Sequence, residues 1–225
     1  MDPEETHHLV RVLRLKEGAR IGVFDGRGME LEAEVLAFAG DQARLKIIRR
    51  LPARGESPLE LALGVSLAKG EAMDAVVRLA TELGVRRIIP FVSERSEKYP
   101  PSRIASRLEK WLRCAREALK SCGRSILPEI GGPWTWEAVL AQDAEIKLIC
   151  WEDAEGGGLP GAPARPRPAG VLLLIGPEGG FSVKEVEQAR DAGFTVISLG
   201  PRRLKVATAA LAALTLLQHR WGDLA

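Results

Sequence analysis

The second part of the chain alternates short apolar runs with longer stretches of helical spacing. Residues 171–175 (VLLLI) are apolar without interruption and precede a glycine, which is typical of a strand buried on both faces of a parallel sheet. The same kinds of pattern predict strands at 59–67, 87–92, 146–151, 171–175 and 195–199, and helices at 71–83, from about 102, at 182–191 and at 207–221. Because strands and helices alternate, we expect an α/β domain.

The first part of the chain has a different pattern. Strand-like runs at 20–24, 30–36 and 43–48 are separated by the turn signals DGRG and GD, so a small β-barrel fits this region. The composition shifts in the Pro- and Gly-containing stretch at 52–58. We therefore predict two domains, a small barrel over residues 1–55 and an α/β domain over residues 58–225.

A glycine loop follows the apolar strand at 171–175. Gly176, Gly179 and Gly180 have no Cβ atom, so their backbone can lie close to a ligand at the carboxyl edge of the sheet. Ser182 with Glu185 three residues later is the signature of a capping box at the start of the next helix. The glycine spacing matches neither the dinucleotide fingerprint nor the P-loop. A simple turn and a ligand loop both remain open at this point.

A second loop of this kind follows the strand at 195–199. It reads GPRRLK over residues 200–205, and the helix at 207–221 after it is apolar on nearly every face. Such a helix is buried in a core or in an oligomer interface. Between the strands at 146–151 and 171–175, residues 155–170 contain five Gly and four Pro, which favours a mobile surface loop.

Charge is distributed unevenly along the chain. The formal net charge is only +2, but Lys69–Arg124 contains 13 basic and 7 acidic residues. Most of this excess follows the helix that begins near residue 102, which predicts either a solvated face or a surface that contacts phosphate. Residues 1–57 hold 10 basic and 10 acidic residues and give no electrostatic signal.

Composition excludes several other classes. The chain has no run of 18 apolar residues, and its beginning, MDPEETHHLV, has no hydrophobic signal core, so we expect a cytoplasmic protein without a membrane span. The three cysteines form no CxxC pair and only three histidines accompany them. Neither a metal site nor a disulfide framework is therefore expected, and we predict three buried, reduced thiols.

The two loops carry a resemblance to a known family. GPEGGFS at 176–182 and LGPR-x-L at 199–204, with TA at 208–209 and LQHRWGDL near the end, resemble the RsmE-type 16S ribosomal RNA uridine methyltransferases of the SPOUT superfamily. Weaker motifs agree in order: His8 with VLR at 12–14, FDG at 24–26, LAKG at 67–70, TELGV at 81–85, SERS at 93–96 and CGR at 122–124. The resemblance spans almost the whole chain.

The resemblance implies a fold and an activity. The expected fold is a trefoil-knotted α/β methyltransferase domain with its knot at the C-terminal end and a PUA-like β-barrel before it. The expected reaction is methylation of N3 of a uridine in 16S ribosomal RNA by S-adenosylmethionine, on the small ribosomal subunit and without a metal. A homodimer formed through the knotted domain is also implied.

Site residues follow from the same resemblance. The implied donor site comprises Ile175, Gly176, Glu178, Gly179, Gly180, Leu199, Gly200, Leu204 and Thr208. Arg202 is the candidate catalytic residue, because a cation beside the uracil would favour the anion that attacks the methyl group. Arg11, Arg14 and Arg124 are the candidates for binding RNA. Arg11 and Arg14 are three residues apart, so on a helical turn they would project from one side.

The sequence also departs from the family pattern. Ala207 stands where members commonly have an acidic residue, Lys120-Ser121 replaces a usual Glu-Gln, and Leu79 stands where Lys is common. The chain begins close to His8, without the opening strand that members often have, so we expect a truncated start or an incomplete barrel. Three classes remain open: an active rRNA methyltransferase, a catalytically silent RNA-binding relative that lacks the carboxylate, and a small-molecule α/β enzyme with an unrelated glycine loop.

Overall fold

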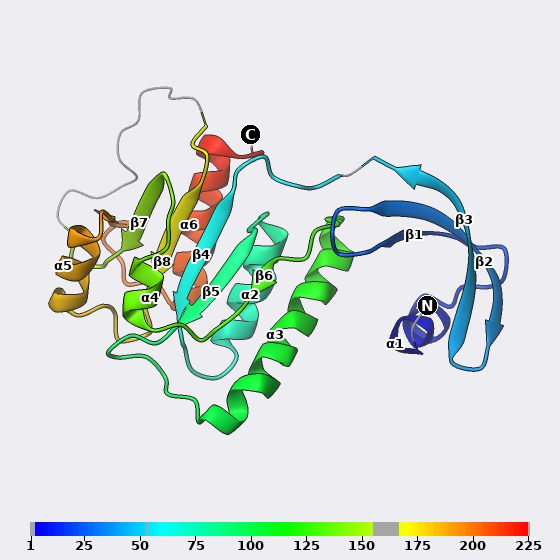
Figure 1. The fold of residues 1–225 in the computed structure, drawn as a ribbon, viewed down its shortest axis with the longest axis horizontal. Helices are drawn as coiled ribbons and strands as arrows, with labels where there is room; N and C mark the ends of the chain where they lie inside the picture. The colour runs from blue at the N-terminus through cyan, green and yellow to red at the C-terminus, as the bar shows by residue number, and fades with distance from the viewer. Residues whose placement is uncertain (1–2, 53, 155–166, 225) are drawn as a thin grey trace. The chain divides into compact units, whose positions relative to one another are not determined.

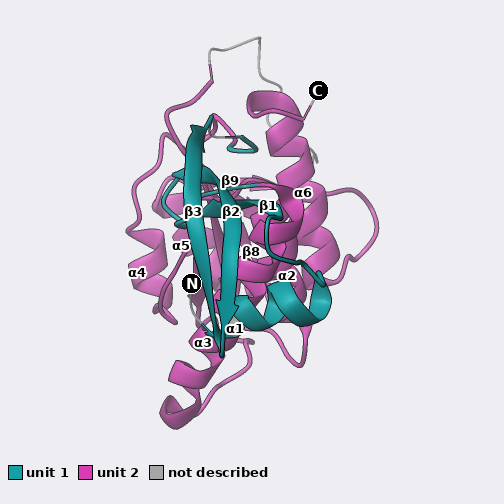
Figure 2. Ribbon diagram, turned by 90° about the vertical axis from the view of Figure 1, so that its right-hand side faces the viewer, with its two compact units in different colours: residues 1–56, 124–126 teal, residues 57–123, 127–225 magenta. Residues whose placement is uncertain are grey.

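The computed structural model describes residues 3–52, 54–154 and 167–224, and the chain divides into two compact units (Figure 2). Unit 1 is Met1–Glu56 together with Arg124–Ile126, and unit 2 is Ser57–Gly123 with Leu127–Ala225. Most of the loop predicted at 155–170 lies outside the described residues. The chain enters unit 2 after residue 56 and returns to unit 1 for three residues, which no sequence pattern indicates.

Unit 1 is built on a three-stranded antiparallel sheet in the order β1-β2-β3. The strands β1 (Arg20–Phe24), β2 (Glu30–Ala39) and β3 (Gln42–Leu51) confirm the three predicted strands, the last two being longer than expected. The described part of the chain begins with α1 (Pro3–His7) and a π-helical turn, η1 (His8–Val12), neither of which was predicted. Arg14 lies beyond this turn with a φ of +52°. The idea that Arg11 and Arg14 share one helical turn is therefore wrong.

The segment Arg124–Ile126 is fastened to unit 1 by the carboxylate of Glu56. One carboxylate oxygen accepts hydrogen bonds from Arg124, at 3.2 Å from Nε and 2.9 Å from Nη2. The other accepts the backbone N–H groups of Ser125 and Ile126, at 2.9 and 2.8 Å. Gly28 adds a backbone hydrogen bond from its N–H to the carbonyl of Ser125. The side chains of Arg124 and Glu56 are only 1% and 12% exposed, so this is a buried ion pair.

Unit 2 is built on a six-stranded parallel sheet in the order β6-β5-β4-β8-β7-β9 (Figure 1). The strands are β4 (Leu61–Ser66), β5 (Arg87–Phe91), β6 (Glu129–Ile130), β7 (Ile146–Cys150), β8 (Val171–Ile175) and β9 (Thr195–Ile197). The helices are α2 (Ala72–Glu82), α3 (Pro101–Cys122), α4 (Trp136–Leu140), α5 (Val183–Asp191) and α6 (Val206–Trp221). All predicted strands and helices of this region are present within a few residues, while β6 and α4 were not predicted.

Helices cover both faces of this sheet. The helices α2, α3 and α6 contribute to one hydrophobic core, and α4 and α5 contribute to the other. In β8, Val171, Leu173 and Ile175 belong to the first core, while Leu172 and Leu174 belong to the second. Burying each such side chain stabilises the fold by about 1.5–3 kcal/mol relative to exposure. A strand that needs apolar residues on both sides therefore reads as an uninterrupted apolar run.

The connections of the sheet predict where a ligand binds. From β4 the chain moves outward to β5, whereas from β8 it passes to β9 on the other side of β7. The strand order therefore diverges between the adjacent strands β4 and β8. In open parallel sheets, crevices form beyond the carboxyl ends of the strands near such a switch point, and β8, on one side of it, carries the first glycine loop.

Candidate ligand pocket

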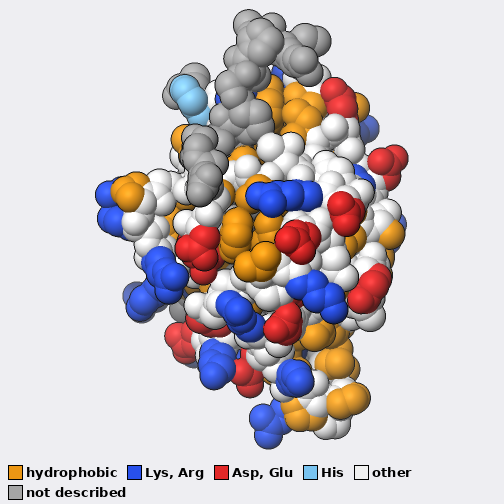
Figure 3. All heavy atoms as spheres, turned by 90° about the vertical axis from the view of Figure 1, so that its left-hand side faces the viewer, with side chains coloured by type: hydrophobic (Ala, Val, Ile, Leu, Met, Phe, Trp, Pro, Cys, Tyr) orange, Lys and Arg blue, Asp and Glu red, His pale blue; other side chains and the backbone are white. Residues whose placement is uncertain are grey.

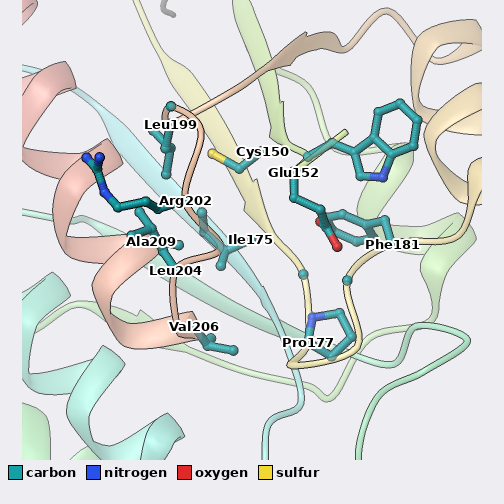
Figure 4. A pocket seen from close by; sticks show the side chains of 14 residues that line it. Cys150, Glu152, Ile175, Pro177, Phe181, Leu199, Arg202, Leu204, Val206 and Ala209 are labelled. Carbon is teal, nitrogen blue, oxygen red and sulfur yellow. The ribbon is translucent and has the colours of Figure 1, made fainter. Parts of the chain in front are cut away.

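The loops at this carboxyl edge form a pocket (Figure 4). Three segments line it: the end of β7, the end of β8 with its glycine loop, and the stretch from β9 into α6. The lining residues are Cys150, Trp151, Glu152, Ile175, Gly176, Pro177, Gly180, Phe181, Leu199, Gly200, Arg202, Leu204, Val206 and Ala209. The two glycine loops singled out in the sequence thus contribute to one site.

The structure gives the glycines of the first loop a different explanation from the expected one. A Cβ atom on Gly176 would meet the ring of Phe181 at 3.1 Å, and one on Gly179 would meet Cβ of Arg95 at 3.3 Å. Gly180 has a φ of +68°, and the carboxylate of Glu152 occupies the space where its Cβ would lie. The missing side chains therefore make room for other side chains of the protein, which fixes the path of the loop.

The helix that follows this loop begins as predicted. Ser182 accepts a hydrogen bond from the N–H of Glu185, and the carboxylate of Glu185 accepts the N–H of Ser182, which confirms the capping box. The second oxygen of Glu185 accepts the N–H of Glu94 from the loop after β5, at 2.8 Å. The start of α5 is therefore joined to a neighbouring strand connection.

The structure brings most of the predicted donor-site residues together. Those that line the pocket are Ile175, Gly176, Gly180, Leu199, Gly200 and Leu204, and the candidate catalytic Arg202 lines it as well. Glu178, Gly179 and Thr208 are not among the lining residues. The carboxylate of Glu178 instead accepts the N–H of Lys69 at 3.0 Å, the carbonyl of Gly179 accepts a hydrogen bond from Arg95 at 2.9 Å, and Thr208 is exposed on α6.

The contribution of β7 to the pocket was not predicted from the sequence. Cys150, Trp151 and Glu152 line the pocket because β7 lies beside β8 and ends at the same edge of the sheet. The predicted strand at 146–151 carried the signal, since the carboxyl ends of parallel strands meet at one edge. Val206 and Ala209 were overlooked because they belong to the apolar face of α6.

Two charged side chains lie on opposite sides of the pocket. Arg202 extends alongside α6, while Glu152 lies over the glycine loop beside Phe181 (Figure 4). Burial raises the pKa of the nearby Cys150 thiol to about 12, so this group stays protonated near neutral pH and is not an activated nucleophile. The three cysteines are free and partly buried rather than fully buried as expected.

The basic helix is less basic than its sequence indicates. On α3, Lys110 pairs with Asp74 and Lys120 with Glu117, while Arg107 lies over the ring of Tyr99. Arg124 was predicted to bind RNA, but its side chain is buried against Glu56, so the structure assigns it to the interior of unit 1. The face of unit 2 that carries α4 and α5 mixes acidic and basic side chains with hydrophobic ones (Figure 3).

Because several basic side chains have partners within the protein, a smaller set of arginines is available to contact phosphate. Arg103, Arg113 and Arg116 on α3 are exposed, as are Arg11 and Arg14 in unit 1.

Within the described ranges, no helix is both long and apolar enough to cross a bilayer. Among the same residues, no group of three or more His, Cys, Asp and Glu side chains could hold a metal ion.

Comparison with known proteins defines the class of this protein. The profile of the RNA methyltransferase domain matches residues 55–218, and that of the RNA methyltransferase PUA domain matches residues 2–48. The parallel sheet with its edge pocket and the N-terminal sheet are thus those of an RNA methyltransferase with a PUA domain, and the structural neighbours have the SPOUT fold.

Individual relatives narrow the class to a family. The chain is 32% identical to ribosomal RNA small subunit methyltransferase E of Buchnera aphidicola subsp. Schizaphis graminum, over 97% of this chain and 89% of that protein. It is 28% identical to the Bacillus subtilis protein of the same name, over 96% and 88%. The chain belongs to the ribosomal RNA small subunit methyltransferase E family, which confirms the resemblance seen in its motifs.

Solved structures agree with this assignment. A methyltransferase from Legionella pneumophila in complex with S-adenosylmethionine is 35% identical, with a TM-score of 0.92 over 99% of this chain and 92% of that one. Ribosomal RNA small subunit methyltransferase E from Neisseria gonorrhoeae, bound to S-adenosylmethionine, is 32% identical, with a TM-score of 0.89 over 100% and 92%.

Proposed function

We propose that this chain transfers a methyl group from S-adenosylmethionine to N3 of a uridine in small-subunit ribosomal RNA, in the cytoplasm. The observation that carries the proposal is the convergence of the family's two most specific motifs, GPEGGFS and LGPR-x-L, on one pocket at the carboxyl edge of the sheet. The relatives named for ribosomal RNA methylation and the neighbours solved with S-adenosylmethionine support it.

The residues of the pocket fit this donor. Apolar side chains of Ile175, Leu199, Leu204 and Ala209 can enclose the flat adenine ring, and the backbone of Gly200, whose Cβ position is open, lets polar parts of the donor approach closely. Glu152 offers a negative group to the ammonium of the donor. When bound, the donor supplies an activated methyl group on a positively charged sulfur.

The protein's own task is then to position the base and exclude water. The uracil N3 must lose its proton to solvent before it attacks, and a cation beside the base favours the anion. We assign this role to Arg202, which lines the pocket and is exposed at its rim. Phe181 and Leu204 line the pocket with apolar side chains, which can exclude water from it. The protonated Cys150 takes no part as a nucleophile.

The test is methyl transfer from labelled S-adenosylmethionine to small ribosomal subunits, followed by nucleoside analysis. The wild-type protein should produce 3-methyluridine, and Arg202→Ala should bind the donor but lose most of the turnover. Arg203→Ala, an exposed neighbour that does not line the pocket, is the matched control. Methylation of another atom, or full turnover by Arg202→Ala, would contradict the proposal.

A catalytically silent relative is the second candidate, because of Ala207. Within α6, the first turn contains no acidic residue, so the carboxylate common in the family is missing from this helix. If that carboxylate is essential, the chain binds donor and RNA without turnover. Ala207→Glu separates the cases, since the silent relative should gain methyl transfer from this substitution and an active enzyme should not need it.

We further propose that unit 1 and the exposed arginines of α3 bind the RNA, with donor binding confined to residues 58–225. The match of the PUA domain supports this for unit 1. Arg11→Ala with Arg14→Ala should weaken RNA binding and reduce the slope of affinity against salt by about 2, while S-adenosylmethionine binding stays unchanged. Lys184→Ala with Arg190→Ala, which removes two exposed charges from α5, outside the proposed RNA surface, is the control.

Assembly is the remaining part of the proposal. We propose a homodimer through α6 and a C-terminal knot, as the family resemblance implies. One face of α6 packs into the core through Ala210, Ala213, Leu214 and Leu217, while Leu211 and Leu216 are 38% and 45% exposed. Exposed leucines are favourable when a second copy covers them. Light scattering should show a dimer at micromolar concentration, and Leu211→Arg with Leu216→Arg should yield monomer.

A further inference from the structure

The glycine loop at residues 176–180, called the donor loop below, is held by the connections that follow two neighbouring strands, β4 and β5. The N–H of Lys69, from the connection after β4, donates to the carboxylate of Glu178 at 3.0 Å. The N–H of Glu94, from the connection after β5, donates to Glu185 at the start of α5. Arg95 donates from Nη1 to the carbonyl of Gly179 at 2.9 Å. Both connections therefore contact the segment that runs from the pocket into α5.

Arg95 contacts the backbone of the loop itself, at Gly179. Its Cβ and Cδ atoms lie 3.3 and 3.4 Å from the place where a Cβ on Gly179 would be, so the side chain packs flat on the glycine backbone. Gly180 comes next in the chain, lines the pocket and adopts a φ of +68°. A movement of the Gly179 carbonyl would rotate the peptide plane that it shares with Gly180. The pocket wall thus depends on the position of Arg95.

The turn that carries Arg95 is closed by hydrogen bonds of two buried serines. Ser93 and Ser96 are buried, and each hydroxyl has a partner: Ser93 pairs with Ser66 at 2.6 Å, and Ser96 donates to the carbonyl of Ser93 at 2.9 Å. The N–H of Ser93 in turn donates to the hydroxyl of Ser96 at 3.1 Å. This explains the SERS motif at 93–96, in which the two serines fold the turn and the residues between them project outward.

We propose that Arg95 is a positioning residue for the donor pocket, and that it acts through Gly179 rather than by touching the reacting atoms. This inference rests on the proposed function, since it names the residue that orders the donor loop. A side chain that holds a loop in its binding geometry reduces the ordering that binding must otherwise supply. Its removal should therefore appear in donor affinity and not in the chemical step.

The experiment compares Arg95→Ala and Arg95→Lys with Lys98→Ala, which removes an exposed charge from the same connection. Calorimetry should show the dissociation constant for S-adenosylmethionine rising about tenfold in Arg95→Ala, the loss expected for one charge-assisted hydrogen bond at an exposed site. Arg95→Lys should recover part of the affinity, because an ammonium can still donate to the carbonyl. Lys98→Ala should match the wild type.

Two further measurements identify the origin of the effect. Turnover at saturating donor should change less than twofold in Arg95→Ala, whereas a large loss of turnover with unchanged affinity would make Arg95 a substrate contact and overturn the inference. Hydrogen exchange of residues 176–181 in the ligand-free protein should increase most in Arg95→Ala, less in Arg95→Lys and not in Lys98→Ala. This exchange measurement needs no donor, so it tests the role of Arg95 independently of donor binding. If the wild-type protein bound no S-adenosylmethionine, that result would refute the proposed function and not the role of Arg95. Unchanged exchange together with unchanged affinity would overturn the role of Arg95.

Discussion

Replacing Glu56 with Ala should destabilise unit 1 far more than an ordinary surface substitution. The change leaves the guanidinium of Arg124, whose side chain is 1% exposed, without its carboxylate. Breaking a buried ion pair by removing one partner costs about 3–5 kcal/mol. The N–H groups of Ser125 and Ile126 also lose their acceptor. Because they share one network with Arg124, the free-energy costs of these losses do not simply add. We expect a total loss of about 3–5 kcal/mol in the free energy of unfolding of unit 1.

The positions of the tryptophans allow the two units to be followed separately. Trp111, Trp134, Trp136, Trp151 and Trp221 are the five tryptophans of the chain, and all belong to unit 2. Tryptophan fluorescence in urea therefore reports unit 2, while hydrogen exchange of β1–β3 reports unit 1. A loss of about 3 kcal/mol should speed exchange through opening of unit 1 on the order of 100-fold.

The matched variants make this prediction refutable. Glu56→Gln keeps an oxygen for the two N–H groups and removes the charge, so its effect should fall between those of wild type and Glu56→Ala. Arg54→Ala removes an exposed partner of Glu30 and should change little. If Glu56→Ala left the exchange of β1–β3 at the wild-type rate, the assignment of Arg124 to a buried, structural ion pair would be wrong.

Three further substitutions test unit 2. In Gly64→Ala, the new methyl group would overlap Leu174 in the core, so the free energy of unfolding measured in urea should fall by about 1–3 kcal/mol. An unchanged midpoint of the urea transition would count against this packing. Ser182→Ala removes the N-cap of α5 and should cost about 1 kcal/mol, whereas Ser182→Thr should keep most of the stability. With a pKa of about 12 in place of 9.0, Cys150 is ionised in about one molecule in 10,000 at pH 8, so iodoacetamide should modify it about 1,000-fold more slowly than a free cysteine, as read by mass spectrometry. Above pH 9 the unfolded chain releases the proton of the Cys150 thiol and the folded chain keeps it, so the free energy of unfolding should fall as pH rises towards 12. This fall should be less steep in Cys150→Ala. Rapid labelling of Cys150 by iodoacetamide at pH 8 would contradict the raised pKa.

The sequence predicted well what depends on neighbours along the chain. The apolar run Val171–Ile175 is a strand buried on both faces, and the Ser182 and Glu185 pair is a capping box, because both patterns lie within one element. The strand β6 has two residues and α4 has five, too few to show a period. The existence and type of the long elements were therefore predictable, and the shortest elements were not.

Features that join distant parts of the chain escaped prediction. Arg124 resembled other cations of the basic helix, and only the fold places Glu56 beside it. Gly179 and Gly180 were expected to make room for a ligand, yet the space beside them is taken by Arg95 and Glu152, which come from other strand connections. The positions of the glycines were informative, but the reason for them required the three-dimensional arrangement.

The return of the chain to unit 1 at Arg124–Ile126 has a consequence for synthesis on the ribosome. Met1–Glu56 is made first, but the carboxylate of Glu56 must wait for partners that are made only after α2, β5 and α3. Domains generally fold in the order in which they are made. Here the N-terminal unit is completed only when the whole of α3 has followed it, so early unit 1 lacks two N–H groups that Glu56 binds and the carbonyl that Gly28 binds. A fragment that ends at residue 56 would keep this unfinished state permanently.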